Sequence, residues 1–110
     1  MSKHRLDVLA RLAETVAARK AEASGQSYTA RLLGKGVPAC AKKLGEEGVE
    51  TALAAVSGDR RQIAAESADL LYHLIVVLEA TGVGLADVMD ELARREGRGG
   101  LAEKAARAGD

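Results

Sequence analysis

The sequence predicts an all-α fold, a helical bundle of about five helices. Alanine, leucine, glutamate and arginine dominate the composition, whereas β-branched residues are few and proline occurs once, a balance typical of helical domains. Apolar residues recur at the spacing of amphipathic helices, and capping residues or glycines separate these stretches. With 110 residues, the chain has the length of one domain with a modest core.

The first two helices are predicted at about residues 3–23 and 28–33. We expect Ser27 to cap the second of them, and the glycines of Gly34-Lys35-Gly36 to end it. The first carries an i, i+3, i+4, i+7 stripe that we expect to face the core, formed by Leu6, Leu9, Ala10, Ala13, Val16 and Ala17.

A third helix is predicted to begin around Pro38, because the first helical turn does not need the missing N–H of proline. It runs to about Val56 and stops at Ser57-Gly58. Gly48 lies inside this helix among apolar positions. We therefore expect Gly48 to allow a neighbouring helix to approach closely.

A fourth helix is predicted to follow Asp59 as its N-cap, with Gln62 completing a capping box, and to end at Thr81-Gly82. Its second half is apolar over most of its circumference, so we expect it to be buried nearly all round. One small chain has too little material to cover such a helix. The prediction is a homodimer, in which the third and fourth helices of two chains complete the bundle.

A fifth helix is predicted at about residues 85–95, where Leu85, Val88, Met89 and Leu92 follow helical spacing. Residues 1–95 then form the predicted domain. Residues 96–110 are rich in glycine, alanine and charge, and we expect a mobile or weakly helical tail.

Two pairs of acidic residues carry the main functional signal. Glu47 and Glu50 lie three apart on the third helix, and Glu66 and Asp69 lie three apart on the fourth, so each pair projects from one helix face. Buried carboxylates need a cation or basic side chains beside them, and carboxylate oxygens are the ligands that Mg²⁺ prefers. The four acids therefore predict a Mg²⁺ site between two helices.

Neighbouring residues extend this predicted site. Glu46 is a candidate accessory ligand or general base, although it could also pair with Lys42 or Lys43. Lys43, with Lys42 beside it, is expected to hold phosphate oxygens next to the metal. The segment of Arg31 and Lys35 lacks the spacing of a phosphate-binding P-loop, but these two cations could still reach a polyphosphate.

The remaining polar and aromatic residues favour structural roles. His73 is expected to be a hydrogen-bonded structural residue, and neither acidic helix has the Glu-x-x-His motif of a di-iron bundle. Tyr28 is a candidate for base stacking or for the core, Tyr72 is expected in the core, and Cys40 is expected to be inert.

Composition argues against several classes of partner. The net charge is zero and the aromatic content is 2%, which disfavours binding to nucleic acid or to an anionic membrane. A single cysteine excludes an internal disulfide and suits a reducing compartment. With no leader and no apolar run of membrane-spanning length, the expectation is a cytoplasmic protein.

Three blocks of the sequence resemble the phosphoribosyl-ATP pyrophosphohydrolase family of histidine biosynthesis, within the all-α MazG-type nucleotide pyrophosphatases. They are Ser-Tyr-Thr at 27–29, Lys-Lys-x-Gly-Glu-Glu at 42–47 and Asp-Leu-Leu-Tyr-His at 69–73. The resemblance covers about residues 6–95. It implies Mg²⁺ bound by Glu47, Glu50, Glu66 and Asp69, with Glu46 as an accessory acid, and it places Gly48 where the family often has alanine.

The resemblance implies hydrolysis of phosphoribosyl-ATP to phosphoribosyl-AMP and pyrophosphate, with Glu46 or Glu47 taking the proton of the attacking water. The alternative within enzymes is a housecleaning pyrophosphatase for noncanonical nucleoside triphosphates, since the metal site is shared. From another class, the acidic stripe could bind a basic protein partner, in which case Mg²⁺ would not change the stability of the fold.

Overall fold

The computed structural model describes residues 5–22 and 25–96, and within these ranges it contains helices and no strand. The helices are α1 (Asp7–Lys20), α2 (Tyr28–Gly34), α3 (Val37–Ser57), α4 (Arg60–Thr81) and α5 (Leu85–Glu96). The prediction of an all-α fold with five helices is confirmed. Of the predicted tail, only Glu96 is described, as the last residue of α5; the rest lies outside the described residues.

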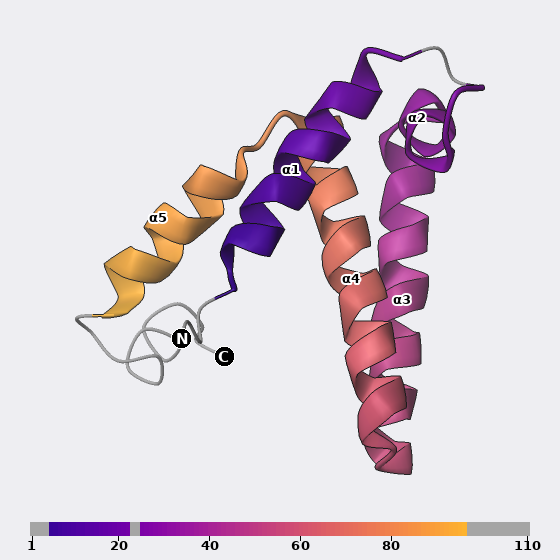
Figure 1. The fold of residues 1–110 in the computed structure, drawn as a ribbon, viewed down its shortest axis with the longest axis vertical. Coiled ribbons are helices and arrows are strands. Elements are labelled where there is room, and N and C mark those ends of the chain that lie inside the picture. The colour runs from indigo at the N-terminus through magenta and orange to yellow at the C-terminus, as the bar shows by residue number, and fades with distance from the viewer. Residues whose placement is uncertain (1–4, 23–24, 97–110) are drawn as a thin grey trace.

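An antiparallel hairpin of α3 and α4 forms the long axis of the molecule (Figure 1). These two helices make the most extensive contact in the fold, α1 packs against α4 and α2, and α2 also packs against α3 and α4. Because the chain reverses directly after α3, the middle of α3 lies beside the middle of α4. The predicted acidic pairs occupy this central part of the hairpin.

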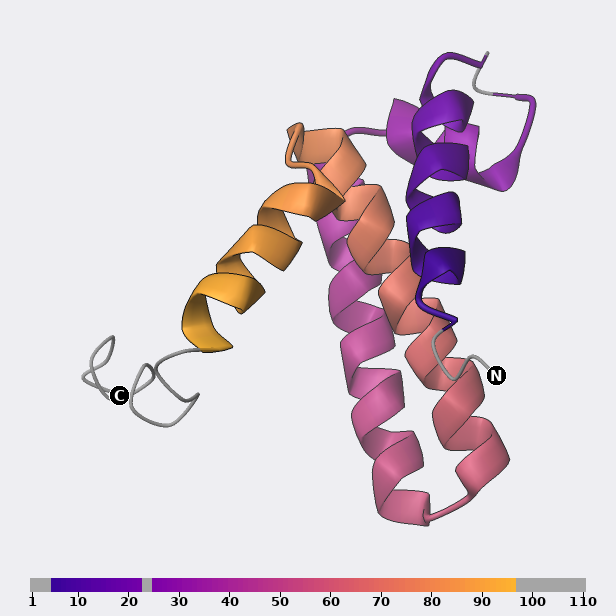
Figure 2. The same cartoon turned by 60° about the vertical axis from the view of Figure 1, so that its left-hand side comes forward.

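The last helix leaves the hairpin. Gly82, in the left-handed conformation (φ 78°), ends α4, and α5 then runs away from the other helices (Figure 2). No single helix of the described residues is long and apolar enough to cross a membrane, and α4 and α5 meet that test only as a pair bent by 110°.

Side chains and glycines set the helix ends as the sequence predicts, with one exception. Ser27 Oγ accepts a hydrogen bond of 3.0 Å from a backbone N–H in the first turn of α2, and Gly58 ends α3 with φ 79°. Asp59 Oδ1 caps α4 by accepting from the N–H of Gln62 at 3.2 Å. However, the N–H of Asp59 donates to Ser57 Oγ at 3.3 Å. The reciprocal half of the predicted capping box is therefore wrong, because the nearer Ser57 hydroxyl takes that donor.

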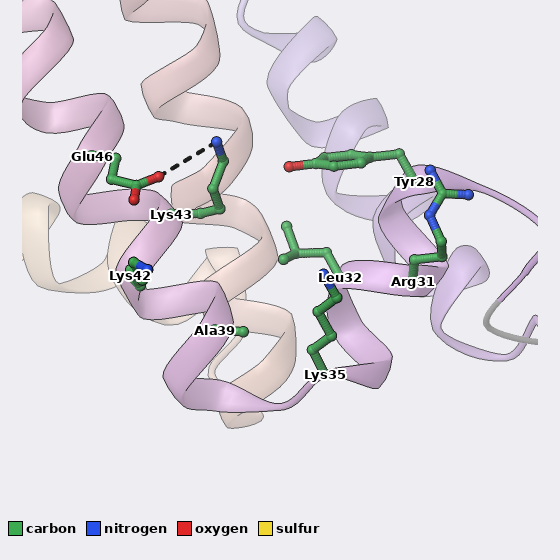
Figure 3. Close-up of a pocket in the computed structure, with 8 residues that line it drawn as sticks. All are labelled: Tyr28, Arg31, Leu32, Lys35, Ala39, Lys42, Lys43 and Glu46. Carbon is green, nitrogen blue, oxygen red and sulfur yellow. Dashed lines mark ion pairs between the residues drawn. The ribbon is translucent and has the colours of Figure 1, made fainter.

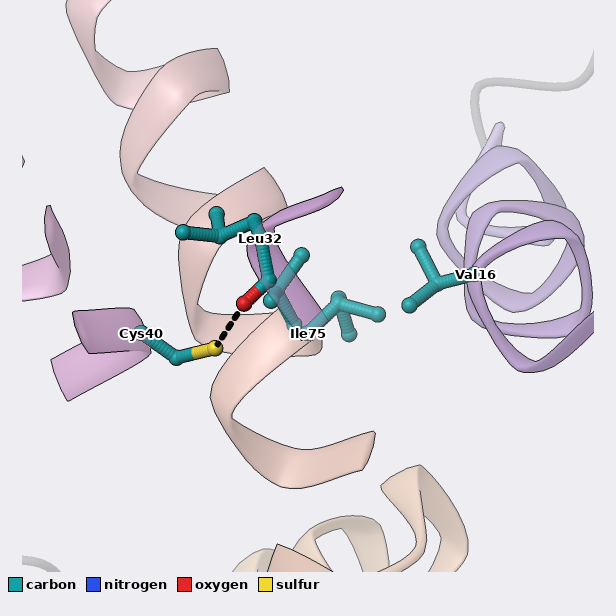
Figure 4. Close-up of a cluster of buried hydrophobic side chains, with 5 residues drawn as sticks. Val16, Leu32, Cys40 and Ile75 are labelled. Atoms are coloured by element: carbon teal, nitrogen blue, oxygen red, sulfur yellow. Dashed lines mark hydrogen bonds between the residues drawn. The ribbon is translucent and has the colours of Figure 1, made fainter. Parts of the chain in front are cut away.

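The core is a small cluster at the end of the hairpin where α1 and α2 pack (Figure 4). It draws on four helices and consists of Val16, Leu32, Cys40, Ile75 and Val76. The Cys40 thiol donates to the Leu32 carbonyl at 3.4 Å, and burial raises the pKa of this thiol. Cys40 is thus a protonated packing residue, as expected from the sequence, and it ties α3 to α2.

The first helix is shorter than predicted. It ends at Lys20, and Glu22 belongs to the following turn, where its carboxylate accepts hydrogen bonds from Arg19 at 2.6 Å and from Ser27 at 3.2 Å. Of the predicted core stripe, Val16 is buried but Leu6 is 75% exposed. The predicted ends at residues 3 and 23 lie outside the described residues.

The fourth helix is only partly buried by its own chain. Of its side chains, His73, Ile75 and Val76 are buried, while Leu71 is 44% exposed. Within one chain, α1, α2 and α3 cover only part of α4; burial nearly all round was predicted for a dimer and stays a prediction.

The expectation for Gly48 is also wrong within this chain. A Cβ atom built on Gly48 would meet no atom within 4 Å outside its own helix backbone and chain neighbours. No described neighbour therefore requires glycine at this position.

Candidate active site

The central feature of the hairpin is a group of three carboxylates. Glu47 on α3 and Glu66 and Asp69 on α4 each offer an oxygen, and these oxygens lie within 4.8 Å of one another. Glu47 and Glu66 are half-buried and Asp69 is exposed. Three of the four predicted metal ligands are thus brought together from two helices; we call these three residues the acid cluster.

The fourth predicted ligand, Glu50, lies at the edge of the acid cluster. It is not among the three converging carboxylates, but its charge acts on Glu66. Burial first, and then the negative charges of Glu50, Asp69 and Glu47, raise the pKa of Glu66. The four acids therefore repel one another, which is the electrostatic condition that a bound cation would relieve.

The geometry of the acid cluster fits a hard divalent cation. Oxygens on opposite sides of one Mg²⁺ are about 4.2 Å apart, since each bond is about 2.1 Å. The oxygens of the acid cluster lie within 4.8 Å of one another. A small rotation of a carboxylate group would bring them to the distance that Mg²⁺ requires. Three carboxylates arranged in this way could hold a metal ion.

Thr51 holds the two helices together at the level of the acid cluster. Its hydroxyl oxygen lies 2.8 Å from the carbonyl oxygen of Glu47 and 3.0 Å from that of Glu66, so one hydroxyl proton is shared between α3 and α4. Sequence reasoning missed this residue. The available signal was its position one helical turn after Glu47, on the same face of α3.

A pocket of about 330 Å³ opens between α2 and α3 (Figure 3). All four cations that the sequence assigned to phosphate binding line it, although they come from two helices and the turn between them. The lining residues are Tyr28, Arg31, Leu32, Lys35, Ala39, Lys42, Lys43 and Glu46. We call this cavity the cationic pocket.

Lys43 joins the cationic pocket to the acid cluster. Its ammonium group lies 3.5 Å from a carboxylate oxygen of Glu46 and 3.7 Å from one of Glu47. The nearby Tyr28 phenol chiefly, and then the carboxylates of Glu46 and Glu47, raise the pKa of Lys43. Lys43 is therefore a permanent positive charge between the two sites. Glu46 lies on the pocket side of this lysine and outside the acid cluster.

A hydrogen-bond chain connects the cationic pocket to α4. The His73 ring is buried, and its Nδ1 lies 3.0 Å from the Asp69 carbonyl oxygen. Because that oxygen can only accept, Nδ1 carries the proton, and Nε2 accepts from the Tyr28 hydroxyl at 3.4 Å. The hydroxyls of Thr29 and Tyr72 form a second link between α2 and α4. The expected structural role of His73 is thus confirmed, and Tyr28 belongs to the pocket wall.

Comparison with known proteins places the chain in a family. Residues 9–96 match the family model described as phosphoribosyl-ATP pyrophosphohydrolase. The matched stretch contains all five helices except the start of α1.

Full-length relatives agree with this match. The phosphoribosyl-ATP pyrophosphatase of Parvibaculum lavamentivorans is 64% identical over 99 residues, covering 90% of this chain and 91% of the relative. That of Cereibacter sphaeroides is 56% identical over 102 residues, covering 93% and 99%. With an all-α hairpin that brings the predicted acids and cations together, the chain belongs to the phosphoribosyl-ATP pyrophosphohydrolase family.

Proposed function

We propose that the protein is a Mg²⁺-dependent enzyme of histidine biosynthesis that hydrolyses phosphoribosyl-ATP to phosphoribosyl-AMP and pyrophosphate. The observation that carries the proposal is the acid cluster beside the cationic pocket, in a chain whose family and relatives are named for this substrate. Carboxylates that hold a cation, next to cations that hold phosphate, are the two elements that phosphoryl chemistry needs.

Glu47, Glu66 and Asp69, with Glu50 at the edge, would hold the Mg²⁺. When bound, Mg²⁺ would neutralise phosphate charge and make a water molecule more acidic. Lys43, 3.7 Å from Glu47, would hold a phosphate oxygen beside the cluster. It would thereby orient the bridge between the α- and β-phosphates.

Glu46 is the better placed of the two candidate bases. Glu47 belongs to the acid cluster, so its oxygens would be engaged by the cation, whereas Glu46 lies outside it. Glu46 would accept a proton from water while the water oxygen bonds to one phosphorus of the α–β bridge. The bond from that phosphorus to the bridging oxygen would break, so that phosphoribosyl-AMP and pyrophosphate separate, and Lys43 would balance negative charge on the departing phosphates.

The proposal includes a homodimer. Val49, Leu53 and Val56 are 61%, 65% and 87% exposed, and they lie within about 60° of one another on the face of α3 that points away from α4. A second copy of this chain would cover this stripe and the exposed Leu71 of α4. The expected result is a dimer in light scattering, and Leu53→Glu should convert it to monomer; a wild-type monomer would contradict this part.

The proposal also includes a cytoplasmic location, which suits the free, buried Cys40.

The deciding experiment measures pyrophosphate release from phosphoribosyl-ATP, ATP, dUTP and ITP, each with Mg²⁺ and with EDTA. Turnover of phosphoribosyl-ATP that requires Mg²⁺ is the expected result. Turnover of the other triphosphates in its place would indicate a housecleaning enzyme. Absence of turnover with all four would overturn an enzymatic role.

A further inference from the structure

The charges of the cationic pocket are unevenly balanced. Four cations and one carboxylate line it. Lys43 is paired with Glu46 and Glu47, but no carboxylate of the described residues forms an ion pair with Arg31, Lys35 or Lys42. These three side chains are exposed and line one cavity.

Such a group of cations favours an anion of high charge. Three uncompensated positive charges repel one another, and a ligand that accepts hydrogen bonds from all three removes the repulsion. A phosphate monoester carries close to two negative charges at neutral pH and has three accepting oxygens. A guanidinium and two ammonium groups suit it without a metal ion.

The position of the pocket matters as much as its charge. Lys43 touches Glu47 of the acid cluster and also lines the pocket, so the two sites adjoin. A ligand with two anionic ends could occupy both at once. Phosphoribosyl-ATP is such a molecule, because it carries a triphosphate at one end and a phosphate monoester on its added ribose at the other.

We infer that Arg31, Lys35 and Lys42 bind the phosphate monoester of the phosphoribosyl group, and that this pocket makes the protein selective for phosphoribosyl-ATP over ATP. The inference rests on the proposed function and assigns the two phosphate-bearing ends of the substrate to two sites. The acid cluster and Lys43 hold the triphosphate, whereas the cationic pocket holds the phosphate that ATP lacks. Selectivity then comes from α2 and the start of α3, not from the carboxylates.

The competing assignment is that the pocket holds the terminal phosphates of the triphosphate itself. The two assignments differ in which ligands bind more weakly when a pocket cation is removed. If the pocket holds the monoester, phosphoribosyl-AMP loses affinity and AMP does not. If the pocket holds the triphosphate, pyrophosphate loses affinity.

The test measures the dissociation constants of phosphoribosyl-AMP, AMP and Mg²⁺-pyrophosphate by calorimetry. The variants are Arg31→Gln and Lys35→Gln, with Arg61→Gln as the matched control, since Arg61 is an exposed cation in the first turn of α4 outside the pocket. Each pocket variant should raise the dissociation constant of phosphoribosyl-AMP about 10-fold. The dissociation constants of AMP and Mg²⁺-pyrophosphate should stay within about twofold of wild type, and the control variant should change none of the three.

Two outcomes would overturn the inference: an equal loss of pyrophosphate or AMP binding, or unchanged binding of phosphoribosyl-AMP. Thermal unfolding of each variant is measured alongside, and wild-type protein gives an independent check. If wild type binds phosphoribosyl-AMP no better than AMP, there is no monoester site. Normal turnover of phosphoribosyl-ATP with unchanged selectivity in the variants rejects only the pocket assignment, whereas absent turnover of phosphoribosyl-ATP by the wild-type protein rejects the proposed function.

Discussion

Glu66 and Glu91 are the same residue type in opposite electrostatic surroundings. Glu66, in the middle of the hairpin, has three acids around it, and burial and their charges raise its pKa. Glu91, on α5, accepts hydrogen bonds from Arg94 at 2.7 Å and Arg95 at 3.0 Å. These arginines lower the pKa of Glu91 to about 2.

The difference distinguishes an acid that is neutralised within its own helix from acids that are not. Glu91 has its cations on the same helix, at the i+3 and i+4 positions, so it needs no ligand. The carboxylates around Glu66 converge across two helices, and Lys43 pairs with Glu46 and Glu47 but not with Glu66. A sequence shows acids in both places, and their surroundings decide which group could hold a metal ion.

The largest expected effect comes from removing a carboxylate of the acid cluster. Glu47→Gln should lower turnover of phosphoribosyl-ATP by at least about 1,000-fold, because the metal supplies several kcal/mol of transition-state stabilisation. Circular dichroism should show unchanged helix content. Glu91→Gln is the matched control and should retain activity. Full activity of Glu47→Gln would remove this residue from the ligand set.

Mg²⁺ should stabilise the hairpin measurably. At 100 times the dissociation constant, binding adds about 2.7 kcal/mol, or roughly 10 °C in the melting temperature of a domain this size. Scanning calorimetry with Mg²⁺ and with EDTA measures the shift. Glu66→Gln should abolish most of it and Glu91→Gln none. A shift of equal size in both variants would place the cation elsewhere.

Thr51 tests whether the convergence of the acids depends on the contact between the helices. Thr51→Val removes a hydroxyl that bonds to both α3 and α4, so about 1 kcal/mol of stability should be lost. Displacement of the carboxylates should lower kcat about 10-fold, with a higher Mg²⁺ requirement. Thr51→Ser keeps the hydroxyl and should restore stability, kcat and the Mg²⁺ requirement. If Thr51→Val lowers stability but leaves the Mg²⁺ requirement unchanged, Thr51 has only a structural role.

A smaller effect is expected from the glycines of the acid-bearing helix. Gly48→Ala should stabilise the protein by up to about 1 kcal/mol, because the added Cβ meets nothing within 4 Å. Gly58→Ala is the control: its surroundings are equally open, but its φ of 79° disfavours alanine, and stability should fall. Urea unfolding measures both. Destabilisation by Gly48→Ala would mean that a second chain fills the space beside it.

The smallest effects are opposite pH dependences in EDTA. Glu91 has a lowered pKa, so its contribution to stability is present above its ordinary pKa of 4.5 and is lost as pH falls toward about 2. Glu66 has a raised pKa, so its ionised form destabilises the metal-free fold, and this penalty disappears as pH falls through the raised pKa. Relative to wild type, Glu91→Gln should be less stable and Glu66→Gln more stable at pH 7, and both differences should shrink on acidification. Differences of the same sign in thermal melts at pH 7 would reject the comparison.

Local signals predicted much of the fold. Ser27 and Asp59 mark helix starts, and Gly58 and Gly82 mark helix ends, because their backbone and side-chain chemistry acts within a few residues. The end of α1 and the partner of the Asp59 N–H were less predictable, since helix ends respond to neighbouring turns. The part of α4 that its own chain covers was not predictable, because an apolar helix surface does not reveal whether the same chain or another one covers it.

The sequence by itself determined the helices, most of their ends and the two acidic pairs, since each depends on residues a few positions apart. Only the tertiary structure decided that Glu50 lies at the edge of the acid cluster and that Thr51 bridges the hairpin. It also decided that cations from α2 and α3 share one pocket. That arrangement depends on the packing of Leu32 against Cys40 in the core, a contact between elements whose relative placement no local pattern encodes.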